Sequence, residues 1–175
     1  VIAIFLIGAI FVVPWMTIRH YASLDRAETE YERSAYLATH DLLTGLPNRF
    51  LFADRFEHAL RGWQRNGQAF ALMLADLDHF KNINDLHGHP MGDRVLKTVA
   101  ALMAENTRAS DSLCRHGGEE FVMVFRGKTA SEACEIVDQT RADLASRNLV
   151  DRNTGERMNQ VSFSGGVADA FAYPD

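Results

Sequence analysis

The sequence predicts an α+β domain with a central antiparallel sheet flanked by helices, preceded by an apolar helix and a helical linker. Residues 1–18 contain no charged side chain, whereas the whole chain is 47% hydrophobic and 23% charged, as in globular proteins. From residue 41 onward the expected elements follow the order α-β-α-β-β-α-β. This order contains a split β-α-β unit, which is typical of ferredoxin-like sheets.

Residues 1–18 are predicted to form a transmembrane helix. A helix of this length spans roughly 27 Å, close to the thickness of the hydrocarbon core of a bilayer. Trp15 lies near its end and Arg19, His20 and Tyr21 follow it, as aromatic and basic residues do at a membrane boundary. A signal-peptide core and a buried helix are the alternatives, but no small-residue cleavage site follows. We expect a membrane anchor with Arg19 on the cytoplasmic side.

Residues 19–40 are polar and helix-prone, and Leu24, Tyr31 and Ala38 recur at intervals of seven. This spacing is typical of helices that pair in a coiled coil. The linker contains only two such heptads, whereas about three or four make the pattern convincing. Two interpretations of this linker stay open. It is either a signalling helix that pairs in a dimer or a solvated connector.

Residues 41–175 are predicted to form the globular domain. Apolar periodicity and stop signals predict helices at residues 52–66, 95–103 and 129–146. Short apolar segments predict strands at residues 69–75, 112–116, 121–125 and 161–168. Thr129 and Glu132 have the spacing of a capping box. A loop is expected over residues 76–91, and a hairpin tip around Gly155.

Charge and cysteine usage exclude some classes of protein. The net charge of −5 gives no support to binding a nucleic-acid polymer, which usually requires a basic surface, but it is compatible with binding a single nucleotide. Cys114 and Cys134 lack the spacing of a metal site or a CxxC motif. We interpret them as buried thiols in a reducing compartment, with a disulfide as the alternative.

Acidic side chains gather at two points of the predicted sheet. Asp76 and Asp78 directly follow an apolar strand, and Glu119 and Glu120 lie in a hairpin. In a split β-α-β sheet, the end of the first strand lies beside the turn that joins the second and third strands. Asp76 and Glu119 should therefore meet in space. Together with a backbone carbonyl such as that of Leu77, they would form an oxygen site suited to Mg²⁺.

Glycine and lysine residues near these carboxylates suit a phosphate ligand. Gly117 and Gly118 let a phosphate approach the backbone, and Lys81 would offset the charge of a triphosphate. Metal-assisted phosphoryl or nucleotidyl transfer is therefore predicted. Either acidic motif alone is more often an ordinary turn, so this prediction depends on the sheet bringing both together. His87 and His89 could ligate zinc, but they have no further Cys or His partner, which favours a solvated or hydrogen-bonding role.

Three stretches, DLLTGLPNR, DLDHFKNINDLHGHPMGD and RASDSLCRHGGEEF, resemble the GGDEF diguanylate cyclase family in its GGEEF form. The resemblance covers about residues 41–168 and implies a palm-like domain. It implies condensation of two GTP molecules into cyclic di-GMP and two diphosphates, by attack of each 3′-hydroxyl on the other α-phosphate across a homodimer. Two Mg²⁺ or Mn²⁺ ions per active site are implied. A location at the bacterial inner membrane, with the catalytic domain in the cytoplasm, is also implied. Inhibition of the enzyme by its product is implied as well.

The resemblance also implies roles for individual residues. The implied metal-binding groups are Asp76, Glu119 and the carbonyl of Leu77. The implied catalytic residues are Glu119, which would help to deprotonate the 3′-hydroxyl, and Lys81, with Asp78 and Glu120 as supporting carboxylates. The implied substrate-binding residues are Asn84, His89, Asp93, Leu43, Leu96, Gly117 and Gly118, of which Asn84 and Asp93 read the guanine base. The implied inhibitory product site is the RxxD pair Arg108 and Asp111.

The sequence departs from the family pattern in two respects. Family members continue beyond the position of Asp175 into a final helix and strand, so we expect a C-terminally incomplete domain. Gly165 stands where the family has a large aliphatic residue, which should weaken strand packing. The alternative function is a non-catalytic signalling module that binds GTP or cyclic di-GMP. Its usual marker, a damaged GGEEF motif, is absent from this sequence.

Overall fold

The computed structural model describes residues 2–147 and 161–170 and divides the chain into two compact units, residues 1–38 and 39–175. The first unit consists of the helix α1 (Ile2–Thr39), which continues without interruption through the predicted linker. On this helix the Arg19 guanidinium lies 5.1 Å from the ring centroid of Trp15.

Within the described part of the chain, no helix has both the length and the apolar character needed to cross a membrane. The predicted transmembrane segment, residues 1–18, falls almost entirely on residues whose side chains lie outside the description. The membrane anchor therefore gains no support here and stays a prediction.

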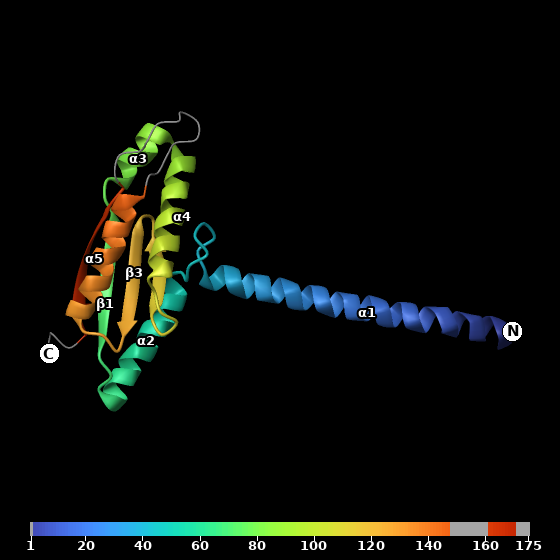
Figure 1. The fold of residues 1–175 in the computed structure, drawn as a ribbon. Helices are drawn as coiled ribbons and strands as arrows, with labels where there is room; N and C mark the ends of the chain where they lie inside the picture. The colour runs from blue at the N-terminus through green and yellow to red at the C-terminus, as the bar shows by residue number, and fades with distance from the viewer. Residues whose placement is uncertain (1, 148–160, 171–175) are drawn as a thin grey trace. The chain divides into compact units, whose positions relative to one another are not determined.

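The second unit is built on a four-stranded antiparallel sheet (Figure 1). Its strands, in spatial order, are β2 (Ser112–Gly117), β3 (Glu120–Arg126), β1 (Phe70–Leu77) and β4 (Phe163–Asp169). Because β3 is antiparallel to both of its neighbours, β1 and β2 run parallel with β3 between them. This is the predicted split β-α-β arrangement, and it is confirmed.

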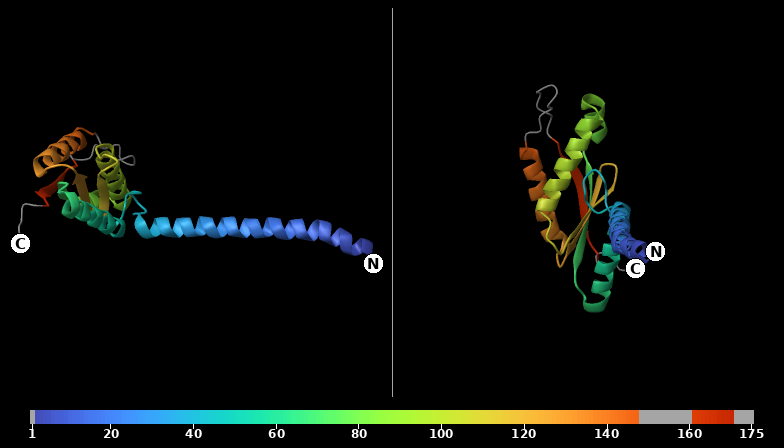
Figure 2. Two further views of the ribbon diagram at one scale, coloured as in Figure 1. Left: turned by 90° about the horizontal axis from the view of Figure 1, so that it is seen from below. Right: turned by 90° about the vertical axis from the view of Figure 1, so that its right-hand side faces the viewer.

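Helices cover both faces of the sheet (Figures 1 and 2). They are α2 (Arg49–Asn66), α4 (His89–Glu105) and α5 (Ala130–Ser146), and the short helix α3 (Phe80–His87) packs against α4. Side chains alternate along β1, so Met73 and Ala75 join the main core beneath α4 and α5. Phe70 instead packs with α2 on the opposite face. The predicted α+β architecture with a central antiparallel sheet is therefore observed.

Local signals in the sequence determine where two helices begin. The Asn48 side chain accepts hydrogen bonds from Phe50 N (3.0 Å) and Leu51 N (3.2 Å) at the start of α2. Thr129 and Glu132 form the predicted capping box at the start of α5. Such caps satisfy backbone N–H groups that have no partner within the helix.

The predicted loop over residues 76–91 is wrong. This stretch contains the eight-residue helix α3, and α4 begins at His89 rather than near residue 95. The turn signals of Gly88 and Pro90 obscured both helices. Gly88 only separates them, and Pro90 lies in the first turn of α4, where proline is tolerated. The predicted hairpin around Gly155 lies outside the described residues.

Both cysteines are free thiols, but only Cys114 is buried, whereas Cys134 is exposed. Burial, with a smaller effect of the Asp41 charge, raises the pKa of Cys114 to about 12. The interpretation as buried thiols is therefore correct for Cys114 and wrong for Cys134, which is exposed on α5.

Gly165 has a role opposite to the expected weakening of strand packing. A Cβ atom at this position would lie 2.7 Å from the Leu74 carbonyl oxygen and 3.1 Å from the Ala75 Cβ. The close approach of β4 to β1 therefore requires a residue without a side chain. The neighbouring Gly166 has no atom within 4 Å of the equivalent position.

The Gly165→Ala substitution is expected to lower the free energy of unfolding by about 1–3 kcal/mol, because the backbone of β4 must shift away from β1. Gly166→Ala is the matched control and should change it by less than about 0.5 kcal/mol. Urea unfolding followed by circular dichroism measures both. Equal effects of the two substitutions on the free energy of unfolding would show that the close approach of β4 to β1 does not require a glycine at position 165.

Candidate active site

The end of β1 and the turn between β2 and β3 lie side by side. The Leu77 N–H donates a hydrogen bond to the Glu119 carbonyl oxygen at 3.3 Å, and Asp76 pairs with Glu120 in the register of β1 and β3. The strand order thus brings together the two acidic motifs that are separated in the sequence. Their predicted convergence is confirmed.

This cluster of carboxylates is electrostatically unfavourable unless a cation is present. Burial, followed by the negative charges of Asp76 and Glu120, raises the pKa of Glu119 above its usual value. Among the described residues, no group of three or more His, Cys, Asp or Glu side chains is arranged to hold a metal ion. Asp76, Glu119 and nearby backbone carbonyls do supply oxygen ligands of the kind that Mg²⁺ prefers, and waters or phosphates usually complete its coordination.

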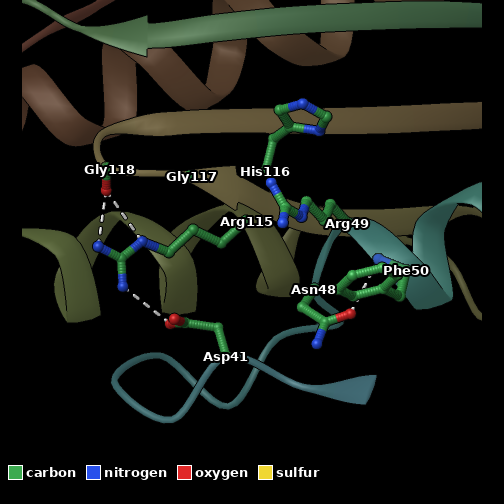
Figure 3. Close-up of a pocket in the computed structure, with 8 residues that line it drawn as sticks. All are labelled: Asp41, Asn48, Arg49, Phe50, Arg115, His116, Gly117 and Gly118. Carbon is green, nitrogen blue, oxygen red and sulfur yellow. Dashed lines mark hydrogen bonds and ion pairs between the residues drawn. The ribbon is translucent and has the colours of Figure 1, made fainter. Parts of the chain in front are cut away.

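Arg115 fixes the glycine turn in place. Its Nε and Nη2 atoms donate hydrogen bonds to the Gly118 carbonyl oxygen at 3.0 and 2.6 Å. Its Nη1 atom forms an ion pair with Asp41 Oδ1 at 2.9 Å (Figure 3). Gly118 has a φ of 44°, in the left-handed region that favours glycine. Arg115 therefore connects the turn that carries Glu119 to the DLLTGLPNR segment.

A pocket of about 340 Å³ opens beside this connection. Figure 3 shows the side chains that surround it. Its lining residues are Asp41, Asn48, Arg49, Phe50, Arg115, His116, Gly117 and Gly118. The pocket lies next to both glycines that were predicted to receive phosphate. Arg49 and His116 add exposed basic side chains to its wall.

Asp78 links the sheet ends instead of joining the acidic cluster. The Ser162 hydroxyl donates a hydrogen bond of 2.5 Å to Asp78 Oδ2, and the Asp78 N–H donates to the Ser162 carbonyl oxygen at 3.0 Å. Hydrogen bonds from the side chains of Ser162 and Ser164 lower the pKa of Asp78. The predicted supporting role is therefore compatible with a structural link between β1 and β4.

The predicted nucleotide-binding residues lie on α3, α4 and the segment before α2. Lys81 is exposed in the first turn of α3, and Asn84 is half-buried further along the same helix. On α4, His89 and Asp93 are exposed. The two predicted pocket-lining residues, Leu43 and Leu96, pack in the same apolar cluster, with Leu96 fully buried and Leu43 partly exposed.

The RxxD pair lies between α4 and β2, with its two members in different environments. Asp111 is buried, and its carboxylate accepts hydrogen bonds from Arg108 N (3.3 Å) and Arg126 N (3.1 Å). Arg108 is exposed. Asp111 therefore holds the loop from which the Arg108 side chain projects.

Arg115, Asp41 and Ser162 are site residues that sequence reasoning did not single out. The connection between Arg115 and Asp41 joins residues 74 positions apart. The only signal for Arg115 in the sequence is its place two residues before Gly117, near the end of a predicted strand. Residue spacing alone does not reveal its partner.

Comparison with known proteins identifies the family. Residues 38–173 match the family described as "Diguanylate cyclase, GGDEF domain", and the chain belongs to this family. It is 41% identical over 117 residues to the bifunctional diguanylate cyclase/cyclic di-GMP phosphodiesterase MucR of Pseudomonas aeruginosa, covering 67% of this chain and 17% of MucR. It is 36% identical over 156 residues to the diguanylate cyclase DgcZ of Escherichia coli, covering 85% of this chain and 49% of DgcZ.

A solved structure has the same fold. The coiled coil and GGDEF domain of DgcB from Caulobacter crescentus, in complex with c-di-GMP, matches with a TM-score of 0.83 and 30% identity. The match covers 90% of this chain and 82% of the DgcB chain. By contrast, the chain spans only 17% to 49% of the length of the two curated relatives named above.

Proposed function

We propose that this chain synthesises cyclic di-GMP from two GTP molecules as a diguanylate cyclase. The observation that carries the proposal is the meeting of Asp76 and Glu119 beside the Gly117-Gly118 turn. Membership of the GGDEF family and two relatives with diguanylate cyclase in their names support it. The intact acidic positions of the GGEEF turn favour an active enzyme over a non-catalytic module that only binds nucleotide.

The proposed mechanism assigns a task to each group at the site. Asp76, Glu119 and the Leu77 carbonyl would hold the metal ions, which when bound supply Lewis-acid polarisation of the α-phosphate. Gly117 and Gly118 give the triphosphate access to the backbone, and the Lys81 ammonium offsets its charge. The Glu119 carboxylate would accept the proton of the attacking 3′-hydroxyl, with Asp78 and Glu120 supporting.

The base of GTP would be read at the junction of α3 and α4. The Asp93 carboxylate accepts hydrogen bonds from donors on the guanine edge, and the Asn84 carboxamide both donates and accepts. His89 would make a further polar contact. Leu43 and Leu96 would line the apolar part of the base pocket.

Two such domains must face each other, because each holds one GTP and the reaction joins two. We propose that α1 pairs with its counterpart in a homodimer. Leu24 and Tyr31, which recur at heptad spacing, are 52% and 75% exposed on α1 and are free to pack against a partner helix. The coiled coil named for the DgcB structure supports this pairing. We further propose that residues 1–18 anchor the dimer in the bacterial inner membrane, with the catalytic domain in the cytoplasm.

Product inhibition is proposed to occur at Arg108 and Asp111. The exposed Arg108 guanidinium suits a phosphate or guanine ligand, and Asp111 holds the loop in place. The DgcB structure in complex with c-di-GMP supports product binding by a domain of this fold.

Incubation of the chain with GTP and Mg²⁺ or Mn²⁺, followed by chromatography of the nucleotides, tests the proposal. The expected products are cyclic di-GMP and diphosphate, with no product when the metal is removed by a chelator. Binding of a non-hydrolysable GTP analogue without turnover would instead favour the non-catalytic signalling module.

A further inference from the structure

Gly92 lies where α3 and α4 come together, and the space beside it is occupied by Asn84. Gly92 is buried in the first turns of α4. A Cβ atom built on it would overlap the carboxamide oxygen of Asn84, and it would lie 3.0 Å from Asn84 Cγ. Phe80 is also near, with its Cζ atom at 3.1 Å. The Asn84 side chain therefore rests directly on the bare backbone of Gly92.

The backbone around this contact is held by hydrogen bonds. The Gly88 N–H donates to the Asn84 carbonyl oxygen at 2.8 Å, and the Gly92 N–H donates to the Gly88 carbonyl oxygen at 3.3 Å. The atom that overlaps the added Cβ is the far end of a flexible side chain, whereas the surrounding backbone is fixed. A methyl group on Gly92 would therefore be accommodated mainly by rotation of the Asn84 carboxamide.

We propose that Gly92 is a positioning residue for recognition of the purine base. Gly92 directly precedes Asp93 on α4. Because Gly92 lacks a side chain, the Asn84 carboxamide can stay at the α3–α4 junction. A guanine edge presents N–H donors for a carboxylate and both donors and acceptors for an amide. The position of the amide thus determines whether both side chains reach one base. This inference rests on the proposed function, because Asn84 and Asp93 are the base-reading residues in it.

The test combines Gly92→Ala and Asn84→Ala in a double-mutant cycle on the full chain. Binding of a non-hydrolysable GTP analogue in the presence of Mg²⁺ is measured by calorimetry, and melting temperature by circular dichroism. Gly92→Ala should keep a folded domain, since alanine favours helices, and weaken GTP-analogue binding about tenfold or more. In the Asn84→Ala background the same substitution should cause no further loss, because the displaced atoms are gone.

Gly62→Ala is the matched control, because Gly62 is also in a helix and its added Cβ would meet only Gln68 Oε1, at 3.8 Å. It should leave binding unchanged. Unchanged binding of the GTP analogue by Gly92→Ala would overturn the proposal. An equal loss of binding in the unchanged chain and in the Asn84→Ala variant would also overturn it, and would assign the effect to Phe80. If Gly92→Ala fails to fold, recovery of folding in the double variant supports the Asn84 contact, and failure of both overturns it. No analogue binding by the unchanged chain would overturn the proposed function as well.

Discussion

Glu119→Gln is expected to lower the rate of cyclic di-GMP formation by about 10²–10³-fold or more at saturating GTP and Mg²⁺. Glutamine keeps the shape of the side chain but removes the negative charge that, in the proposed mechanism, holds the metal ions and accepts the proton of the 3′-hydroxyl. The free energy of unfolding should stay the same or rise slightly, because Glu119 is repelled by Asp76 and Glu120 in the metal-free protein. Chromatographic assay of cyclic di-GMP and thermal unfolding measure the two effects.

The matched control for this substitution is Glu135→Gln, which removes the same charge from an exposed position on α5. It should leave the rate within about twofold of the original. If Glu119→Gln retains more than about a tenth of the original rate, the catalytic role assigned to Glu119 is wrong. A loss of rate accompanied by unfolding would point to a structural role for this residue.

Arg115→Ala is expected to lower the free energy of unfolding by about 2–3 kcal/mol and to reduce activity strongly. The Arg115 and Asp41 side chains are only 13% and 24% exposed, so solvent screens their ion pair weakly. The substitution also removes two hydrogen bonds to the Gly118 carbonyl oxygen. The turn that carries Glu119 then loses its attachment to the segment before α2. Urea unfolding and the cyclic di-GMP assay measure the stability and the activity.

Arg61→Ala is the control for this second substitution, because Arg61 and Glu57 form an ion pair whose side chains are 63% and 67% exposed. Exposed pairs of this kind contribute little, so the expected change is below about 0.5–1 kcal/mol. Comparable losses for Arg61→Ala and Arg115→Ala would contradict the role of the buried connection.

Acid titration gives an independent check of the same connection. Burial tends to raise the pKa of Asp41, but hydrogen bonds from Thr44 and Arg115 and the Arg115 charge together lower it below its ordinary value of 3.8. A carboxylate with a lowered pKa stabilises the fold above its ordinary pKa, and this contribution disappears as the pH falls through the lowered value. The unchanged chain should therefore lose stability below about pH 4 more steeply than the Arg115→Ala variant.

The convergence of Asp76 and Glu119 was predictable because it depends only on strand order. A split β-α-β unit places the end of β1 beside the β2–β3 turn whatever side chains surround it. The start of α5 was equally predictable, since the capping box of Thr129 and Glu132 is a local interaction. The helix α3 was not, because an eight-residue helix between turn residues carries too little periodicity to be recognised.

Periodicity, strand order and residue type were enough to predict the antiparallel core, the pairing of the two acidic motifs and the chemistry that these motifs favour. Three further features appear only in the folded chain: Arg115 reaches Asp41, Asp78 bonds to Ser162, and Gly92 and Gly165 have no room for a side chain. Each of these depends on distances between segments far apart in the chain or on the packing of neighbouring elements. Such distances are determined by how helices and strands pack, and residue spacing along the chain does not encode them in a readable form.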